Sequence, residues 1–230
     1  MFFSLRFLVL LAGLLVITAE ENKWTSEKCT EKKSLYDTLW DDNSNIAQEA
    51  LNTNFLVLMA GGSLAAERYM NFTLQDIYYA VKVTELLNIQ AKKSDPRKDV
   101  REFFNGRNAS YTRFANDLLT EFHFKVFPTL EPSPAMKKYI SSFDALLKED
   151  PLYFVVGLLP CSKLWPYLAQ NMNIKESSPY INFKNNNKDD RSRKHFEQVL
   201  ENHRKEMNES KANYIFKSHM ENERDFFAES

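Results

Sequence analysis

Apolar side chains recur at helical spacing along most of this chain. The longest such stretch, 65–91, contains no Gly or Pro, and Met70, Leu74, Ile77 and Val81 repeat within it. No window shows the alternation and flanking turns of paired strands. The same reading predicts helices over 34–51, 100–104, 111–124, 135–148, 191–207 and 211–227, with a turn at Asn105-Gly106. The pattern predicts an all-α, single-domain bundle of seven or eight helices.

Two segments between these helices read differently. The stretch 175–190 is polar, with three consecutive asparagines at its centre, and is predicted to be a long exposed connection. In the segment 151–172, Pro160 stands directly before Cys161, and Pro favours the first turn of a helix. We therefore expect a helix to begin near Pro160, with Cys161 in its first turn.

The N-terminal residues have the pattern of an export signal. Residues 1–19 carry one charge, Arg6, then an apolar run and a small residue at Ala19. A polar lead-in over 20–33 precedes the helical domain, 34–230. Sequons begin at Asn71, Asn108 and Asn208, and Asn108 is the best glycosylation candidate because it adjoins the predicted turn. These features predict a secreted glycoprotein.

Composition narrows the classes of partner. Lys and Arg number 30 against 31 for Asp and Glu, so no broad basic surface for nucleic acid is predicted. Five glycines without a Gly-rich turn argue against a phosphate cradle. The four histidines form no tight cluster with Cys or Asp, and after the signal no segment reads as a membrane span. We expect no metal, no cofactor and no membrane partner.

Three positions carry candidate chemistry. Asp76 and Tyr79 lie three apart on one helix face, so they either line a polar cavity or face solvent. Glu223 shares a face with Phe227, which suits a carboxyl for proton transfer unless the segment is a solvated tail. Cys161, in a first turn, would have a lowered pKa and the setting of a nucleophile, although most unpaired cysteines are small buried apolar residues. By count it could instead pair with Cys29.

Together these pieces resemble the TenA, or thiaminase II, family, whose fold is that of haem oxygenase. The similar blocks are Phe72-x-x-Gln75-Asp76-x-x-Tyr79, Leu159-Pro160-Cys161 with Leu164-Trp165-Pro166-Tyr167-Leu168, and Phe216 through Phe226-Phe227. The block Pro179-Tyr180-x-x-Phe183 is similar in a degraded form. The resemblance covers nearly the whole chain after the signal. It would make this chain a secreted, eukaryotic-type member.

The resemblance implies a role for each site residue. Cys161 would attack the aminopyrimidine ring, Asp76 would hydrogen-bond the ring nitrogen and amino group, and Glu223 would move the proton. Tyr79 would orient this group, Tyr139 would replace an aromatic hydroxyl where Met136 stands, and Tyr167 would form a pocket wall. A further family aromatic is Asn187 here. We expect Asp76, Cys161 and Glu223 to line one pocket, with Cys161 a free thiol. The family's usual tetramer is also implied.

The predicted export of the chain favours one of the reactions that this resemblance implies. Cleavage of thiamine, by hydrolysis or by exchange with a nucleophilic co-substrate, suits an exported enzyme better than intracellular salvage of a degraded vitamin. Two alternatives remain open from the sequence. The chain could bind thiamine or a pyrimidine without catalysis, or it could be an unrelated, cytokine-like helical ligand.

Overall fold

A computed structural model describes residues 33–125 and 130–230, which belong to one compact unit, Lys33–Ser230. The expected signal, Cys29 and nearly all of the lead-in lie outside the described residues. The described helices are α1 (Leu35–Leu51), α2 (Asn54–Gly61), α3 (Ala66–Ala91), α4 (Lys98–Glu121), α5 (Pro134–Leu146), α6 (Pro151–Asn171), α7 (Ile181–Asn187), α8 (Arg193–Asn202) and α9 (Glu209–Glu229), with a 3₁₀ turn, Arg204–Glu206. No strand occurs in this described part, and the all-α, single-domain prediction is confirmed.

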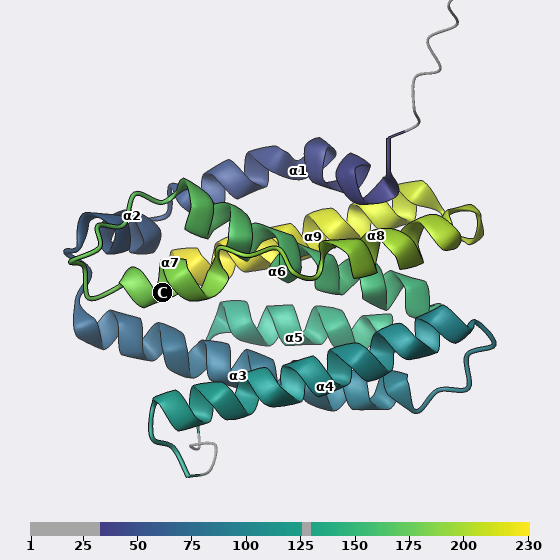
Figure 1. Ribbon diagram of the computed structural model, residues 1–230, viewed down its shortest axis with the longest axis horizontal. Helices are drawn as coiled ribbons and strands as arrows, with labels where there is room; N and C mark the ends of the chain where they lie inside the picture. The colour runs from purple at the N-terminus through teal and green to yellow at the C-terminus, as the bar shows by residue number, and fades with distance from the viewer. Residues whose placement is uncertain (1–32, 126–129) are drawn as a thin grey trace, which may run out of the picture. The chain divides into compact units, whose positions relative to one another are not determined.

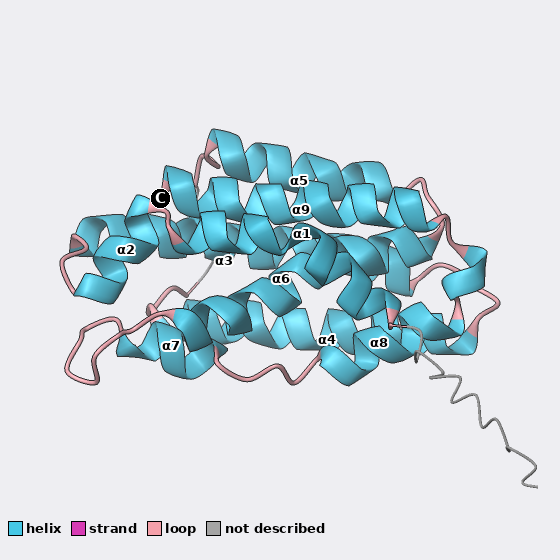
Figure 2. Cartoon of the chain, turned by 90° about the horizontal axis from the view of Figure 1, so that it is seen from above, coloured by secondary structure: helices cyan, strands magenta, loops and turns pink. Residues whose placement is uncertain are grey.

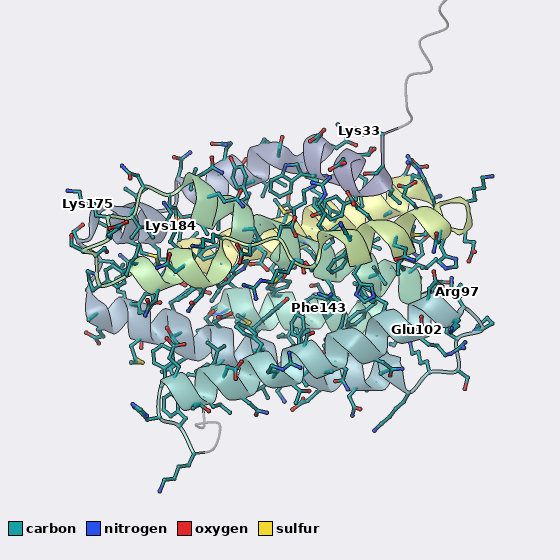
Figure 3. The ribbon with its side chains drawn as sticks, in the orientation of Figure 1. Lys33, Arg97, Glu102, Phe143, Lys175 and Lys184 are labelled. Atoms are coloured by element: carbon teal, nitrogen blue, oxygen red, sulfur yellow. The ribbon has the colours of Figure 1, made fainter. Side chains whose placement is uncertain are left out.

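Helix α9 organises the bundle because it packs against α1, α5 and α6. Figure 1 shows α3 and α4 running along each other on one side, α1 on the opposite side, and α5, α6 and α9 between them. Seen from above, α7 lies beside α6 (Figure 2). Phe143 of α5 lies inside the bundle with no measurable exposure (Figure 3). Helices α6 and α9 therefore pack together at the centre of the fold, and α3 reaches them through the ring contacts of Phe72 with Trp165 and Phe227.

Helix α6 begins nine residues earlier than expected. Pro151 occupies its first turn, and the carboxylate of Asp150 caps it by accepting a hydrogen bond from the amide of Leu152 at 2.8 Å. The prediction that a helix starts at Pro160 is therefore wrong, and Cys161 lies in the helix interior. Among the described residues, α6 alone is long and apolar enough to cross a membrane, but 67% of its apolar window is buried inside the fold.

The remaining differences concern short elements. Helix α4 is continuous through Asn105-Gly106, because one helical Gly costs only about 1 kcal/mol and packing against α3 exceeds that cost. The expected loop around Asn108 is therefore wrong. Its side-chain oxygen is buried, whereas Asn71 and Asn208 are exposed. The expected exposed connection contains α7, which is held by buried Phe183. Residues 54–61 form α2.

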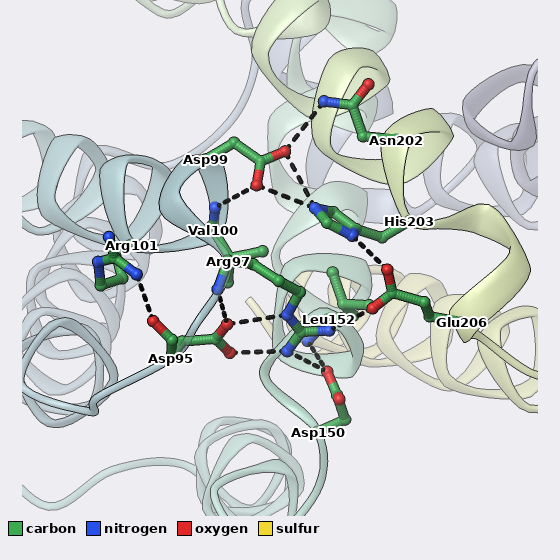
Figure 4. A network of polar contacts seen from close by, with 10 residues as sticks. All are labelled: Asp95, Arg97, Asp99, Val100, Arg101, Asp150, Leu152, Asn202, His203 and Glu206. Carbon is green, nitrogen blue, oxygen red and sulfur yellow. Dashed lines mark hydrogen bonds and ion pairs between the residues drawn. The ribbon is translucent and has the colours of Figure 1, made fainter.

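A charged network ties three segments together at one end of the bundle. Arg97, before α4, contacts Asp95 at 2.6 Å, Asp150 at 3.0 Å and Glu206 at 3.1 Å. His203 bridges Glu206 and Asp99, as Figure 4 shows. The network joins the α3–α4 loop, the N-terminus of α6 and the segment between α8 and α9. Lys175 and Lys184 lie near the opposite end (Figure 3).

Candidate active site

The candidate residues come from three helices that are distant in sequence. Asp76 and Tyr79 are supplied by α3, Cys161 by α6, and Glu223 by α9. Asp76 is 8% exposed and Glu223 is 1% exposed, so neither carboxyl belongs to a solvated helix face or tail. The helical spacing of three that placed Asp76 and Tyr79 on one face directs both toward the interior. The solvent-facing alternatives for both acids are therefore wrong.

Two adjoining cavities open onto these residues. We call the first, of about 230 Å³, the thiol cavity, because Cys161, Tyr79 and Tyr111 line it. The second, of about 380 Å³, is the acidic cavity, with Asp117 and Glu121 in its wall. The residues common to both are Asp76, Phe114, Trp165, Asn186 and Asn187. A ligand that spans both cavities would pass Asp76.

Glu223 lies behind the cavities rather than in their walls. Its Oε1 accepts a hydrogen bond from the Tyr139 hydroxyl at 2.7 Å, and its Oε2 accepts one from the Trp165 indole at 3.1 Å. Burial raises the pKa of Glu223 to about 7, even though Tyr139, Trp165 and the Cys161 thiol interact with the carboxylate and oppose that shift. The expectation that all three groups line one pocket is therefore met by Asp76 and Cys161 alone.

Asp76 has no such support. Its carboxyl makes no hydrogen bond to another described residue, although it is buried. Burial and the negative charge of Glu223 raise the pKa of Asp76 to about 8. The buried Tyr79 hydroxyl makes no well-formed hydrogen bond in the described part of the chain, but it interacts with the Cys161 thiol and with the hydroxyls of Tyr111 and Tyr139. Buried carboxyls without a partner are costly in a folded protein and are typical of binding sites, where a ligand supplies the missing partner.

Cys161 carries a free thiol that is not activated in the resting site. Burial, together with the charges of Glu223 and Asp76, raises its pKa well above the ordinary value. The expected lowering by a helix N-terminus is wrong because Cys161 lies ten residues into α6. A thiol in this environment reacts only if a neighbouring base takes its proton as the new bond forms. Glu223 is the buried carboxylate that interacts with it.

Aromatic side chains surround this polar group. Trp165 lies one helical turn after Cys161, and its ring is 6.0 Å from that of Phe72 and 5.3 Å from that of Phe227. Its place on the Cys161 face follows from the i, i+4 spacing, so the sequence contained this signal. Tyr111 also lines the thiol cavity and interacts with Cys161. Nothing in its local sequence distinguishes it from other helical tyrosines.

Two sequence-predicted tyrosines lie elsewhere. Tyr139 is 1% exposed and lines neither cavity, so it orients Glu223 instead of contacting a ligand. Tyr167 is not a pocket wall. Its hydroxyl accepts a hydrogen bond from Gln48 of α1, and its ring packs edge-on against Trp40 with centroids 5.3 Å apart. The physical reason is helix periodicity, since Tyr167 lies two residues after Trp165 and so points to another side of α6.

The part of the chain that the structure describes contains no group of three or more His, Cys, Asp or Glu side chains placed to hold a metal ion. His219, one turn before Glu223, is buried against the Phe143 ring, and burial lowers its pKa to about 3. It is therefore a neutral core residue. The chemistry available to the cavities is that of a thiol, two protonatable carboxyls and tyrosine hydroxyls.

Comparison with known proteins supports the fold. No protein-family model matches the chain, and no curated protein is similar to it in sequence at a significant level. Among solved structures, a TenA homologue from Pyrococcus furiosus matches with a TM-score of 0.71 and 19% identity, over 84% of this chain and 98% of that one. A TenA homologue from P. horikoshii OT3 matches with a TM-score of 0.66 and 20% identity, over 85% and 97%. The chain has the fold of TenA homologues.

Proposed function

We propose that this chain is a thiaminase-like enzyme that cleaves thiamine, or a related aminopyrimidine, through a covalent adduct on Cys161. The observation that carries the proposal is a free thiol, Cys161, that borders a cavity and interacts with two buried carboxyls of raised pKa, Asp76 and Glu223. A purely structural core has no use for Asp76 in particular, because a buried carboxyl without a charged or hydrogen-bonded partner is costly. The TenA-like fold is consistent with it.

In the first step, the Cys161 sulfur bonds to an electron-poor carbon of the pyrimidine while its proton passes to the Glu223 carboxylate. Asp76 hydrogen-bonds the ring nitrogen and amino group and stabilises the altered ring. The bond to the thiazolium nitrogen then breaks, and its electron pair leaves with the neutral thiazole.

In the second step, water or a primary or secondary amine attacks the former bridging carbon and releases one proton to solvent, whereas pyridine has no proton to lose and gives a pyridinium product. The ring expels the sulfur, which takes back the proton from Glu223. The atoms balance with one nucleophile consumed and one thiazole released. The cavities are wide enough for a small nucleophile beside a ring, so hydrolysis and exchange use the same machinery.

Replacement of the three groups tests the proposal. We expect Cys161→Ser and Asp76→Asn to abolish thiamine cleavage, and Glu223→Gln to lower kcat about 100- to 10,000-fold, because proton transfer is worth that much. Products would be separated after incubation with and without pyridine as the nucleophile. Tyr214→Phe, at a site 73% exposed, is the control and should retain full activity.

Two results would contradict the proposal. Near-normal cleavage by Cys161→Ser would rule out the covalent step. Tight thiamine binding by the unaltered chain with no cleavage, whatever nucleophile is supplied, would favour a non-catalytic thiamine-binding protein. Circular dichroism of every variant would show that the helical content is unchanged.

A further inference from the structure

The walls of the two cavities carry an excess of negative charge. Asp117 and Glu121 line the acidic cavity, Asp189 lines the thiol cavity, and Asp76 belongs to both. The one cation among the lining residues is Arg191, and its guanidinium pairs with Asp189 at 2.8 Å. After that pair is set aside, the charged groups that remain among the described lining residues are the carboxylates of Asp117 and Glu121, because Asp76 is mainly protonated at neutral pH.

Asp117 and Glu121 are placed to act together. They lie four residues apart on α4, so both side chains project from one face of the helix. Neither carboxylate has an ion pair or a hydrogen bond within the described residues. Two like charges at this spacing destabilise a helix slightly, and no contact within the described residues offsets that effect.

Aromatic rings share the same walls. Phe114 lines both cavities and is 41% exposed, although it is large and apolar. Phe72, Trp165 and Phe183 line the acidic cavity beneath it. The face of an aromatic ring attracts cations, and carboxylates at the edge of an aromatic pocket add to that attraction. The combination of groups is typical of sites for organic cations.

A second observation indicates a ligand at this place. Asp76 is 8% exposed, lines both cavities and has no hydrogen-bond partner among the described residues, so its partners come from the cavity, as water or as a bound molecule. The ligand therefore places hydrogen-bonding atoms at Asp76 and extends from there along the acidic cavity.

We propose that the acidic cavity is a subsite for a positively charged aromatic group, with Asp117 and Glu121 as its specificity-determining residues. This inference rests on the proposed function, and it assigns the substrate class. The pyrimidine would occupy the thiol cavity and the thiazolium the acidic cavity. The site then selects the thiamine cation over the neutral aminopyrimidine alone. It disfavours thiamine monophosphate, whose phosphate would meet the two unpaired carboxylates.

Equilibrium binding separates this subsite from the chemistry. The Cys161→Ser chain, which prevents turnover, would be titrated by calorimetry with thiamine, thiamine monophosphate and 4-amino-5-hydroxymethyl-2-methylpyrimidine. Addition of Asp117→Asn and Glu121→Gln should raise the Kd for thiamine about 3- to 10-fold at low salt and lower that for the monophosphate. The neutral pyrimidine should change less than about 2-fold, since it carries no charge.

The matched control is Glu102→Gln, which removes an exposed carboxylate from the other end of the same helix, near Arg97 (Figure 3). It should leave all three affinities unchanged. Between about 0.02 M and about 0.5 M NaCl the effect of the double substitution should shrink, because salt screens exposed charges.

Four results would overturn the subsite. These are equal shifts for thiamine and the neutral pyrimidine, no shift for thiamine, the same shift with Glu102→Gln, or failure of thiamine to bind at all. If the charge dependence holds while the unaltered chain never cleaves thiamine, the subsite stands and the proposed reaction fails. If cleavage occurs without the charge dependence, the reverse holds.

Discussion

At the scale of single residues, the site is defined by two acids, Asp76 and Glu223, whose pKa values are raised by burial. Burial disfavours the charged form of Asp76, and the charge of Glu223 disfavours it further. At neutral pH one of the two carboxyls is therefore mainly protonated while the other serves as the base. That division of roles suits a reaction that needs both a hydrogen-bond donor and a proton acceptor.

The raised pKa of Asp76 predicts how stability depends on pH. Unfolded, the group titrates near pH 4, whereas in the folded protein its pKa is about 8. Between these values the folded state binds more protons, so this contribution to stability is present below about pH 4 and lost as pH rises to about 8. Asp76→Asn should therefore stabilise the ligand-free protein at pH 8, on the order of 2 kcal/mol, and much less at pH 5.

Urea denaturation at the two pH values measures this difference. Asp117→Asn is the control, because its exposed carboxylate should give no comparable gain. An equal effect of Asp76→Asn at both pH values would mean that the native carboxyl titrates normally.

Tyr139 tests how Glu223 is tuned. Its hydroxyl donates to Glu223 and stabilises the carboxylate, so Tyr139→Phe should raise the pKa of Glu223 further. We expect kcat near neutral pH to fall about 10-fold and the acid limb of the pH–rate profile to move to higher pH. A fall in kcat without movement of that limb would assign Tyr139 a packing role alone.

At the scale of elements, the sequence was sufficient for long amphipathic helices and insufficient at α6. The bounds of α1, α3 and α5 follow from apolar spacing, and in the structure Ser34 and Ser133 cap the first turns of α1 and α5. Helix α6 is apolar on all sides over its buried first half, so periodicity gives no start, and its interior prolines misdirected the prediction. Packing on every side of α6 compensates for the hydrogen bonds that Pro160 and Pro166 cannot make.

Some residues of the candidate site could likewise be predicted from the sequence, and others could not. Asp76, Cys161 and Glu223 were found by their unusual residue types in apolar helices and by resemblance. Tyr111, Asp117 and Glu121 were missed because α4 was predicted as two helices, and its relation to α3 is set by tertiary packing. Tyr167 was predicted as a pocket wall from the family resemblance alone. Its position two residues after Trp165 places it on another side of α6, against α1.

The contact of α6 with α5 and α9 gives an element-scale prediction. A Cβ at Gly157 would lie 2.7 Å from Leu146 Cδ1 and 3.2 Å from His219 Cε1. Gly157→Ala should therefore destabilise the protein by about 1 to 3 kcal/mol, since overpacking forces side chains aside. Gly106→Ala is the matched change in α4, where a Cβ would meet His195 at 3.6 Å.

Gly106→Ala should be neutral or stabilising by up to about 1 kcal/mol, because Ala favours a helix over Gly. Thermal unfolding of both variants measures the difference. If Gly157→Ala were as stable as Gly106→Ala, helix α6 would pack less tightly than described.

At the scale of the whole molecule, the charged network around Arg97 holds one end of the bundle together through ion pairs, whereas apolar packing holds the interior. It joins segments from three parts of the chain at an end of the bundle. The hydrogen bond with Arg97 lowers the pKa of Asp95, and the one with His203 lowers that of Glu206. Burial alone would lower the pKa of His203, but Glu206 and Asp99 reverse that effect and raise it. Each shift means that folding stabilises the charged form.

The signs of these shifts set the pH window of the network. Asp95 and Glu206 contribute stability above about pH 4, and this contribution is lost as pH falls through their lowered folded pKa values. His203 contributes stability below about pH 6.5, and this contribution is lost as pH rises through its raised folded pKa.

Arg97→Gln leaves three carboxylates without their shared cation. We expect it to destabilise the protein by on the order of 2 kcal/mol at pH 6, and by less at pH 3, because the charge stabilisation of Asp95 and Glu206 is lost progressively as pH falls toward their lowered folded pKa values. Lys98→Gln breaks an exposed pair at 3.5 Å and should cost no more than about 0.5 kcal/mol at either pH. Urea denaturation of both variants at the two pH values decides the point, and an equal cost of Arg97→Gln at pH 3 and pH 6 would show that its side chain acts through packing and not through charge.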